Sequence, residues 1–119
     1  MESLMDLLGG IYNELESLKL TDINVYDSGG KSILADYFFV SSADSIVQLE
    51  AVRNNLIRYM KKFKTYLRNS MEEWHGGWCL LDFGDIIIHI FLEERRSFFQ
   101  IDRLMESSGY ALIDVSVPA

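Results

Sequence analysis

The stretch "GGWCLLDFGDIIIHIF", residues 76–91, predicts a β-hairpin around which the rest of the fold is arranged. Gly84 and Asp85 form a two-residue turn of the kind that tolerates the positive φ angles of tight hairpins. With this turn, six pairs of residues oppose each other: Phe83 with Ile86, Asp82 with Ile87, Leu81 with Ile88, Leu80 with His89, Cys79 with Ile90 and Trp78 with Phe91. Because successive side chains of a strand point in opposite directions, this pairing sorts the hairpin into two faces.

The two faces of the hairpin differ in polarity. One face is apolar except for a thiol and is expected to lie against the core; it carries Cys79, Leu81, Phe83, Ile86, Ile88 and Ile90. The other face mixes aromatic, aliphatic and polar side chains: Trp78, Leu80, Asp82, Ile87, His89 and Phe91. Two explanations fit a mixed face. Either one of the protein's own helices covers it, or a second macromolecule docks there, since aromatic anchors are enriched at interfaces.

The charge around the hairpin slightly favours the docking explanation. Between Arg68 and Arg95 the chain contains no Lys or Arg and six acidic residues: Glu72, Glu73, Asp82, Asp85, Glu93 and Glu94. Such a stretch would attract a cationic surface.

Hydrophobic periodicity predicts the elements before the hairpin. Apolar residues three and four apart predict a helix from Leu4 to Leu18, which Gly9 and Gly10 interrupt. Strands are expected at "DINVYD" (22–27) and at "DYFFVSS" (36–42), the second of them central. A long helix follows, with Ser42 or Asp44 as its cap and with apolar spacing that continues through position 67. Its opposite face carries six bases and is expected to be solvated: Arg53, Arg58, Lys61, Lys62, Lys64 and Arg68.

The segment after the hairpin predicts a third helix and a last strand. "EERRSFFQIDRLM" (93–105) has helical spacing, with Phe98, Ile101 and either Leu104 or Met105 facing inward. A last strand is expected within "YALIDV" (110–115). The order of elements predicts an α/β or α+β fold, a mixed β-sheet of four to five strands flanked by helices.

Composition sets the class of protein. The 119 residues, 49% apolar, suit a single domain spanning 1–119. A net charge of −7 argues against nucleic acid or anionic lipid as the driving partner and favours a basic one. Cys79 is the single cysteine, which a reducing compartment permits, and no basic apolar leader or run of 18 apolar residues occurs. The sequence therefore predicts a cytoplasmic protein without a membrane segment.

Motifs that suggest catalysis or a cofactor are weak. Asp82 and His89 share a face, but a carboxylate and an imidazole without a nucleophile are poor evidence for an active site. "DFG" at 82–84 and "GGKS" at 29–32 match nucleotide-binding motifs only in letters, because the residues that work with those motifs are missing. His75 and His89 lack metal-ligand spacing. We expect no catalytic residue, no metal and no cofactor.

Three sequence blocks carry a resemblance to a known family. In chain order they are "DYFFV" before the long helix, "WCLLDFGDIIIHIF", and "ERRSFFQIDRL". Together with the earlier "DINVYD" and "GKS", they resemble the ribosomal silencing factor family (RsfS, or Iojap-like proteins) from about Leu18 to Met105. The most specific positions of this resemblance are Trp78, Asp82, Gly84, Asp85, His89, Arg96 and Phe98.

The resemblance implies a non-enzymatic cytosolic factor. Such a factor would bind the large ribosomal subunit through its fourteenth protein, obstruct joining of the small subunit and so repress translation. The fold implied is nucleotidyltransferase-like in topology, without the active site. The chain departs from the family pattern at "SADS" after the second strand and at Gln48, Phe99 and Met105.

The leading hypothesis is therefore steric docking of the mixed hairpin face and the third helix on a basic ribosomal protein. The expected partner-binding residues are Trp78, Leu80, Asp82, Asp85, His89, Phe91, Arg96 and Phe98. Two other classes stay open at this point. One is a metal-dependent enzyme of nucleotidyltransferase type, and the other is a self-associating structural module, a homodimer through the mixed face.

Overall fold

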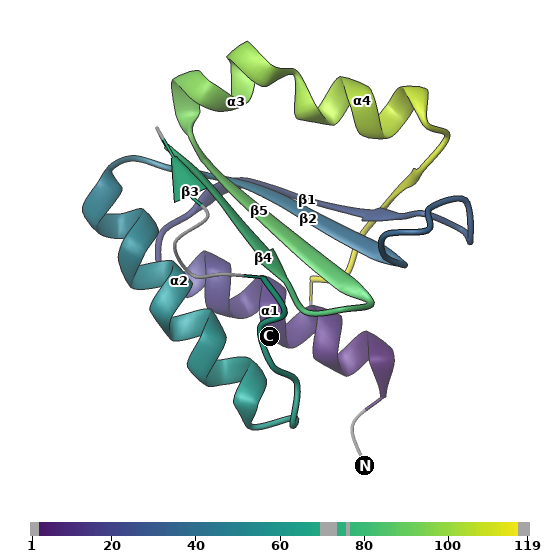
Figure 1. The fold of residues 1–119 in the computed structure, drawn as a ribbon, viewed down its shortest axis with the longest axis horizontal. Helices are drawn as coiled ribbons and strands as arrows, with labels where there is room; N and C mark the ends of the chain where they lie inside the picture. Colours follow the sequence, from purple (N-terminus) through teal and green to yellow (C-terminus); the bar gives the residue numbers. More distant parts are fainter. Residues whose placement is uncertain (1–2, 70–73, 76, 117–119) are drawn as a thin grey trace.

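The fold has three layers, with a mixed β-sheet between two pairs of helices (Figure 1). The computed structural model describes residues 3–69, 74–75 and 77–116. Helices α1 (Leu4–Ser17) and α2 (Ile46–Lys61) cover one face of the sheet. Helices α3 (Glu93–Phe99) and α4 (Ile101–Ser107) cover the other face. Each helical layer closes its own apolar core against the sheet.

Six strands form the sheet within the described residues. They are β1 (Thr21–Asp27), β2 (Tyr37–Ala43), β3 (Trp74–His75), β4 (Trp78–Asp82), β5 (Ile86–Leu92) and β6 (Ala111–Ile113), in the order β3-β4-β5-β2-β1-β6. Strands β2 and β5 are parallel, and the other neighbours are antiparallel. The expected mixed sheet with a central second strand is confirmed, and the short β3 adds one strand to the four to five expected.

The hairpin register matches the prediction pair by pair. Strands β4 and β5 place Trp78 opposite Phe91 and Leu80 opposite His89. The turn closes where the Phe83 amide donates to the Ile86 carbonyl at 2.9 Å. Gly84 has a φ of +92°, which a residue without a Cβ adopts freely. The face predicted to be apolar is buried under α1 and α2.

Helix α1 runs through both glycines without interruption. A Cβ at Gly10 would lie 2.0 Å from the Tyr59 hydroxyl oxygen, so the missing side chain lets α1 approach α2. Gly10 therefore serves helix packing, which offsets its low helix propensity.

Helix α2 begins and ends differently from the prediction. Ser45 is its N-cap, because its hydroxyl accepts from the Gln48 amide at 3.1 Å. The expected cap Ser42 is buried in β2, and its hydroxyl accepts instead from Arg96. The helix ends at Lys61, and Lys64 follows with a φ of +55°, so the apolar spacing beyond position 61 belongs to a loop.

The expected third helix is two helices. Gln100 between them has a left-handed backbone with φ +52° and ψ +43°. After this break, Ile101 and Met105 face the sheet and Leu104 faces solvent, while Phe98 is 73% exposed. The prediction of an inward Phe98 was wrong because the left-handed residue changes which positions of the segment face the sheet.

Candidate functional site

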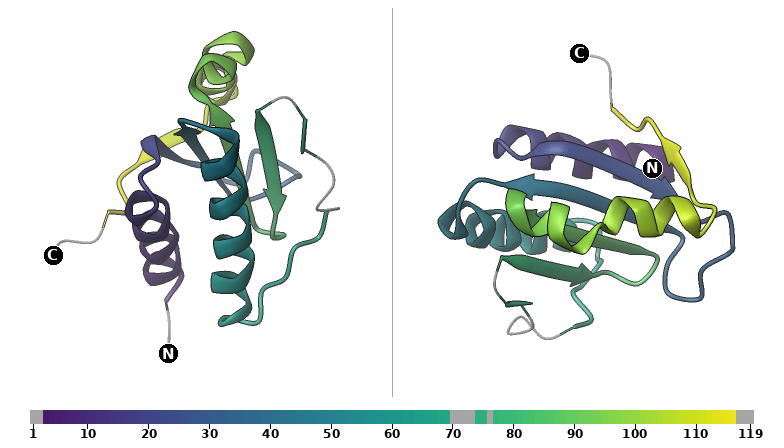
Figure 2. Two further views of the ribbon diagram at one scale, coloured as in Figure 1. Left: turned by 90° about the vertical axis from the view of Figure 1, so that its left-hand side faces the viewer. Right: turned by 90° about the horizontal axis from the view of Figure 1, so that it is seen from above.

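The mixed face of the hairpin lies beneath α3 and α4. Seen from above, the two helices run along the strands with β4 at their side (Figure 2, right). They bury Phe91 and His89, which are only 1% and 7% exposed, whereas Trp78 and Leu80 stay half-buried at the margin. The protein's own helices therefore cover part of the mixed face, while its margin at Trp78 and Leu80 remains partly exposed.

Stacked rings form a continuous row under these helices. Trp78 stacks on Phe91 with ring centroids 5.4 Å apart, and its indole N–H donates to Nδ1 of His89 at 3.2 Å. Phe38 and Tyr110 extend the row from the far side of His89. Burial lowers the pKa of His89 to about 4, so its imidazole is neutral near pH 7 and can accept the indole hydrogen bond. The row holds the indole of Trp78 in place at the margin of the sheet.

A mostly apolar groove opens beside Trp78, between α4 and β4. Its volume is about 320 Å³. We call it the Trp78 groove; it is lined by Leu34, Phe38, Trp78, Leu80, His89, Ile101, Leu104, Met105, Ser108 and Tyr110. Leu34 and Leu104 contribute exposed apolar surface at its rim. A partner's apolar side chain could fill this groove.

Helix α3 carries exposed aromatic and acidic side chains. The Phe99 ring lies 5.5 Å from the indole of Trp78 and contacts the ring of Phe98 in turn. Glu93 and Glu94 are exposed in the first turn of the same helix. Glu72 and Glu73, which belong to the expected acidic stretch, lie outside the described residues.

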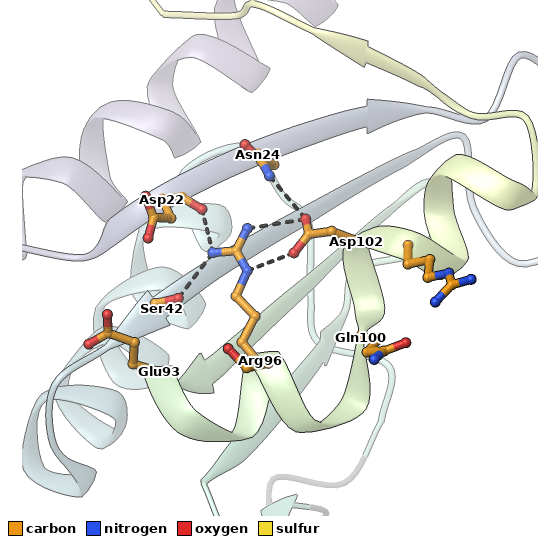
Figure 3. Close-up of a pocket in the computed structure, with 9 residues that line it drawn as sticks. Asp22, Asn24, Ser42, Glu93, Arg96, Gln100 and Asp102 are labelled. Atoms are coloured by element: carbon orange, nitrogen blue, oxygen red, sulfur yellow. Dashed lines mark hydrogen bonds and ion pairs between the residues drawn. The ribbon is translucent and has the colours of Figure 1, made fainter.

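A partly buried ion pair attaches α3 and α4 to the sheet. Arg96 donates to both carboxylate oxygens of Asp102, at 2.8 and 3.1 Å, and also to the Asp22 carbonyl and the Ser42 hydroxyl (Figure 3). Tyr26 donates to the same carboxylate at 2.6 Å. The guanidinium of Arg96 is therefore engaged by hydrogen bonds within the protein.

The pKa of Asp102 reflects the hydrogen bonds that its carboxylate accepts in this network. Burial by itself would raise the pKa of Asp102, but hydrogen bonds from Arg96, Tyr26 and Asn24 outweigh it and lower the pKa to about 2. Burial and the neighbouring Asp102 carboxylate raise the pKa of Tyr26. An open polar hollow of about 580 Å³ adjoins the pair, and its side chains bear charges of both signs.

The polar residues of the hairpin do not assemble a catalytic pair. The Asp82 carboxylate accepts from the Gly84 amide at 2.8 Å and so closes the turn. His89 is buried and hydrogen-bonded to Trp78. Within the described part of the chain, no three His, Cys, Asp or Glu side chains gather as a metal site would need. No helix in that part is long and apolar enough to cross a membrane.

Comparison with known proteins decides the family. The model of the family described as "Ribosomal silencing factor during starvation" matches residues 2–117. The chain belongs to this family. The ribosomal silencing factor of Zymomonas mobilis is 33% identical over 103 residues, which cover 87% of this chain and 75% of that protein. The Haemophilus influenzae factor is 31% identical and is covered over 98% of its length, against 84% of this chain.

A solved structure supports the fold of this family member. The crystal structure of a Chromobacterium violaceum protein superposes with a TM-score of 0.79 at 25% identity, covering 88% of each chain. The α+β class with helices on both faces of a mixed sheet is therefore shared with a known structure.

The expected partner-binding residues fall into three groups by their exposure and contacts in the structure. At or near the surface lie Trp78, Leu80, Asp82, Asp85 and Phe98. Phe91 and His89, also among the expected partner-binding residues, are buried behind Trp78 and present little surface to a partner. Arg96 belongs to the internal ion pair.

Sequence reasoning missed the residues that line the groove from other elements. Leu34 comes from the β1–β2 loop, Leu104 from α4 and Tyr110 from the segment before β6. Their exposed or half-exposed apolar character is visible only once the fold places them. The sequence left either Leu104 or Met105 as the inward residue of this segment. Choosing Met105 would have placed Leu104 on the exposed side, where it lines the groove.

Proposed function

We propose that this protein docks on the large ribosomal subunit through the Trp78 groove and, by its bulk, prevents the small subunit from joining. The observation that carries the proposal is an apolar groove beside a half-buried tryptophan in a member of the ribosomal silencing factor family. A half-buried aromatic beside an apolar groove is the arrangement that binding hot spots use. The partner is then the fourteenth protein of the large subunit, and the setting is the cytoplasm.

The exposed acids of α3 and of the hairpin turn support a basic ribosomal protein as the partner. Glu93 and Glu94 are exposed on α3, and Asp85 is exposed at the hairpin turn. Opposite charges raise the association rate of such a pair, and salt screens the effect. Burial of the groove against an apolar side chain then supplies the affinity.

The action proposed is steric and involves no catalytic step. The carboxylate of Asp82 and the imidazole of His89 are both engaged in structural hydrogen bonds. Repression of translation then follows from occupancy of the subunit surface, so its extent depends on the fraction of subunits bound.

The test is co-sedimentation with separated ribosomal subunits. We expect the protein to sediment with the large subunit and to lower the yield of joined ribosomes. Trp78→Ala should weaken binding at least tenfold, or about 1.4 kcal/mol, because truncation empties the groove wall. Leu104→Asp should have a similar effect without disturbing the core, since Leu104 is 58% exposed.

The matched control is Leu112→Ala, which removes an exposed apolar side chain at the opposite edge of the sheet, on β6. It should bind like the unmodified protein. Unchanged affinity of both Trp78→Ala and Leu104→Asp would remove the groove from the interface. Sedimentation with the small subunit alone would overturn the proposed partner.

A further inference from the structure

Positive charge is concentrated in one short segment of this acidic protein. Residues 51–69 contain six bases and no acid, while the other five bases and all eighteen acids lie outside it. The net charge of −7 therefore conceals a strongly basic segment at the end of α2 and in the loop that follows. Net charge alone does not describe such a molecule, because a local field of one sign attracts its own class of partner.

The structure exposes most of this charge. We call the exposed cations Arg58, Lys61, Lys62, Lys64 and Arg68, together with Tyr66, the basic tip. Arg58 and Lys61 lie in the last turn of α2, where cations also stabilise the helix dipole. Lys64 and Arg68 lie beyond the helix, where that stabilisation does not explain them.

A hollow in the basic tip contains an exposed aromatic ring between cations. Its volume is about 330 Å³, and it is lined by Lys64, Thr65, Tyr66, Leu67, Arg68 and Phe83. Tyr66 is 58% exposed. Cations that contact phosphates, beside a flat ring on which a base can stack, are the features of single-stranded nucleic acid sites.

The segment that carries the hollow is tied to the sheet. The Arg68 amide donates to the Asp82 carbonyl at 2.7 Å. The next residue, Asn69, donates to the Leu80 carbonyl and accepts from the Asp82 amide at 2.8 and 2.9 Å. The guanidinium of Arg68 also lies beside Gly84 of the hairpin turn. The basic tip is thus held in position before any partner arrives, which lowers the entropy lost on binding.

We propose that the basic tip binds a single-stranded segment of RNA, with phosphates on Lys61, Lys64 and Arg68 and an unpaired base on Tyr66. This site is separate from the Trp78 groove, since α2 lies across the sheet from α3 and α4 (Figure 1). The choice of RNA rests on the proposed function, because a ribosomal subunit presents RNA beside its proteins. A lipid surface fits less well, because the apolar face of α2 is buried in the core and cannot enter a bilayer.

The experiment measures binding of the full chain to a fluorescent single-stranded RNA of about 12 nucleotides, a length within the range of known single-stranded sites. The triple variant Lys61→Gln, Lys64→Gln, Arg68→Gln should lose at least tenfold in affinity. Its slope of log affinity against log salt should fall by about 2, since each contact to a single strand contributes about 0.7. Tyr66→Ala should lose about fivefold or more, through lost stacking.

A charge-matched control replaces three exposed bases elsewhere: Lys19→Gln, Arg95→Gln and Arg103→Gln. This control has the same net charge as the Lys61/Lys64/Arg68 triple variant. Its RNA affinity should stay within about twofold of that of the unmodified protein, because no phosphate contact is lost. Equal losses in both triple variants would overturn the proposal, as would equal affinity for an oligoglutamate peptide of the same charge. Leu104→Asp should bind this RNA normally, so failure of groove docking and failure of RNA binding remain distinguishable.

Discussion

At the scale of single residues, His89 illustrates how a polar group serves the site without touching a partner. It is buried between rings, and its unprotonated Nδ1 accepts the indole N–H of Trp78. Protonation would remove this acceptor and leave a charge in an apolar layer. The orientation of Trp78 is therefore coupled to the protonation state of His89.

We expect this coupling to make stability depend on pH. The pKa of His89 falls from 6.5 to about 4 in the folded protein, so the unfolded chain takes up the proton first as pH falls. Stability is full above about pH 6.5 and is lost as pH falls toward 4, by about 2 kcal/mol between pH 7 and pH 5. Urea denaturation at both pH values measures it. His89→Gln retains an acceptor and should flatten the dependence; an equal pH effect in this variant would exclude His89 as its source.

At the scale of elements, the attachment of α3 and α4 decides the shape of the groove. Two short helices with a left-handed residue between them have little stability of their own. The Arg96–Asp102 pair joins both helices, and Asn24, Tyr26 and Ser42 bind it to β1 and β2. The groove beside Trp78 exists because this network holds α4 over the sheet.

Asp102→Asn tests the attachment. Loss of the carboxylate leaves the buried guanidinium of Arg96 without its counter-charge, and we expect about 2 kcal/mol of destabilisation at pH 7 by urea denaturation. The variant should also lack the one part of the parent's acid sensitivity that comes from Asp102, whose contribution to stability is present above pH 3.8 and is lost as pH falls to about 2. Asp44→Asn, at an exposed carboxylate between β2 and α2, is the control and should leave the urea midpoint unchanged.

At the scale of the whole molecule, the two proposed surfaces lie on different sides of the sheet. The Trp78 groove is lined in part by α4, which with α3 covers one face of the sheet, while the basic tip lies at the end of α2, which covers the other face (Figure 1). One domain could thus contact a basic protein and an RNA segment at the same time. Two contacts of modest affinity would then reinforce each other. Once one surface is bound, the other is held close to its own partner at a high effective concentration, which raises the overall affinity.

This arrangement predicts additive losses on the ribosome. Leu104→Asp and the Lys61/Lys64/Arg68 triple variant should each weaken binding to large subunits, and their combination should multiply the two factors to within about 0.5 kcal/mol. Equilibrium co-sedimentation of the unmodified protein, the two variants and the combined variant with large subunits measures this double-mutant cycle. A combined variant no weaker than the weaker parent would show that the two surfaces do not contribute independently.

The sequence by itself determined the hairpin register, the mixed sheet and the face that packs on α1 and α2. These follow from local chemistry: a glycine turn aligns the strands, and a period of two sorts their side chains. Motif order was also sufficient to identify the family before any fold was seen.

Only the tertiary structure decided what covers the mixed face and where the charges gather. Arg96 contacts Ser42, 54 residues away, and the Tyr26 hydroxyl binds a carboxylate 76 residues away. No local pattern specifies such partners, because they depend on how whole elements pack. The basic segment 51–69 can be read from the sequence, but the placement of the loop after α2 decided which of its cations lie exposed near Tyr66 and the hairpin turn.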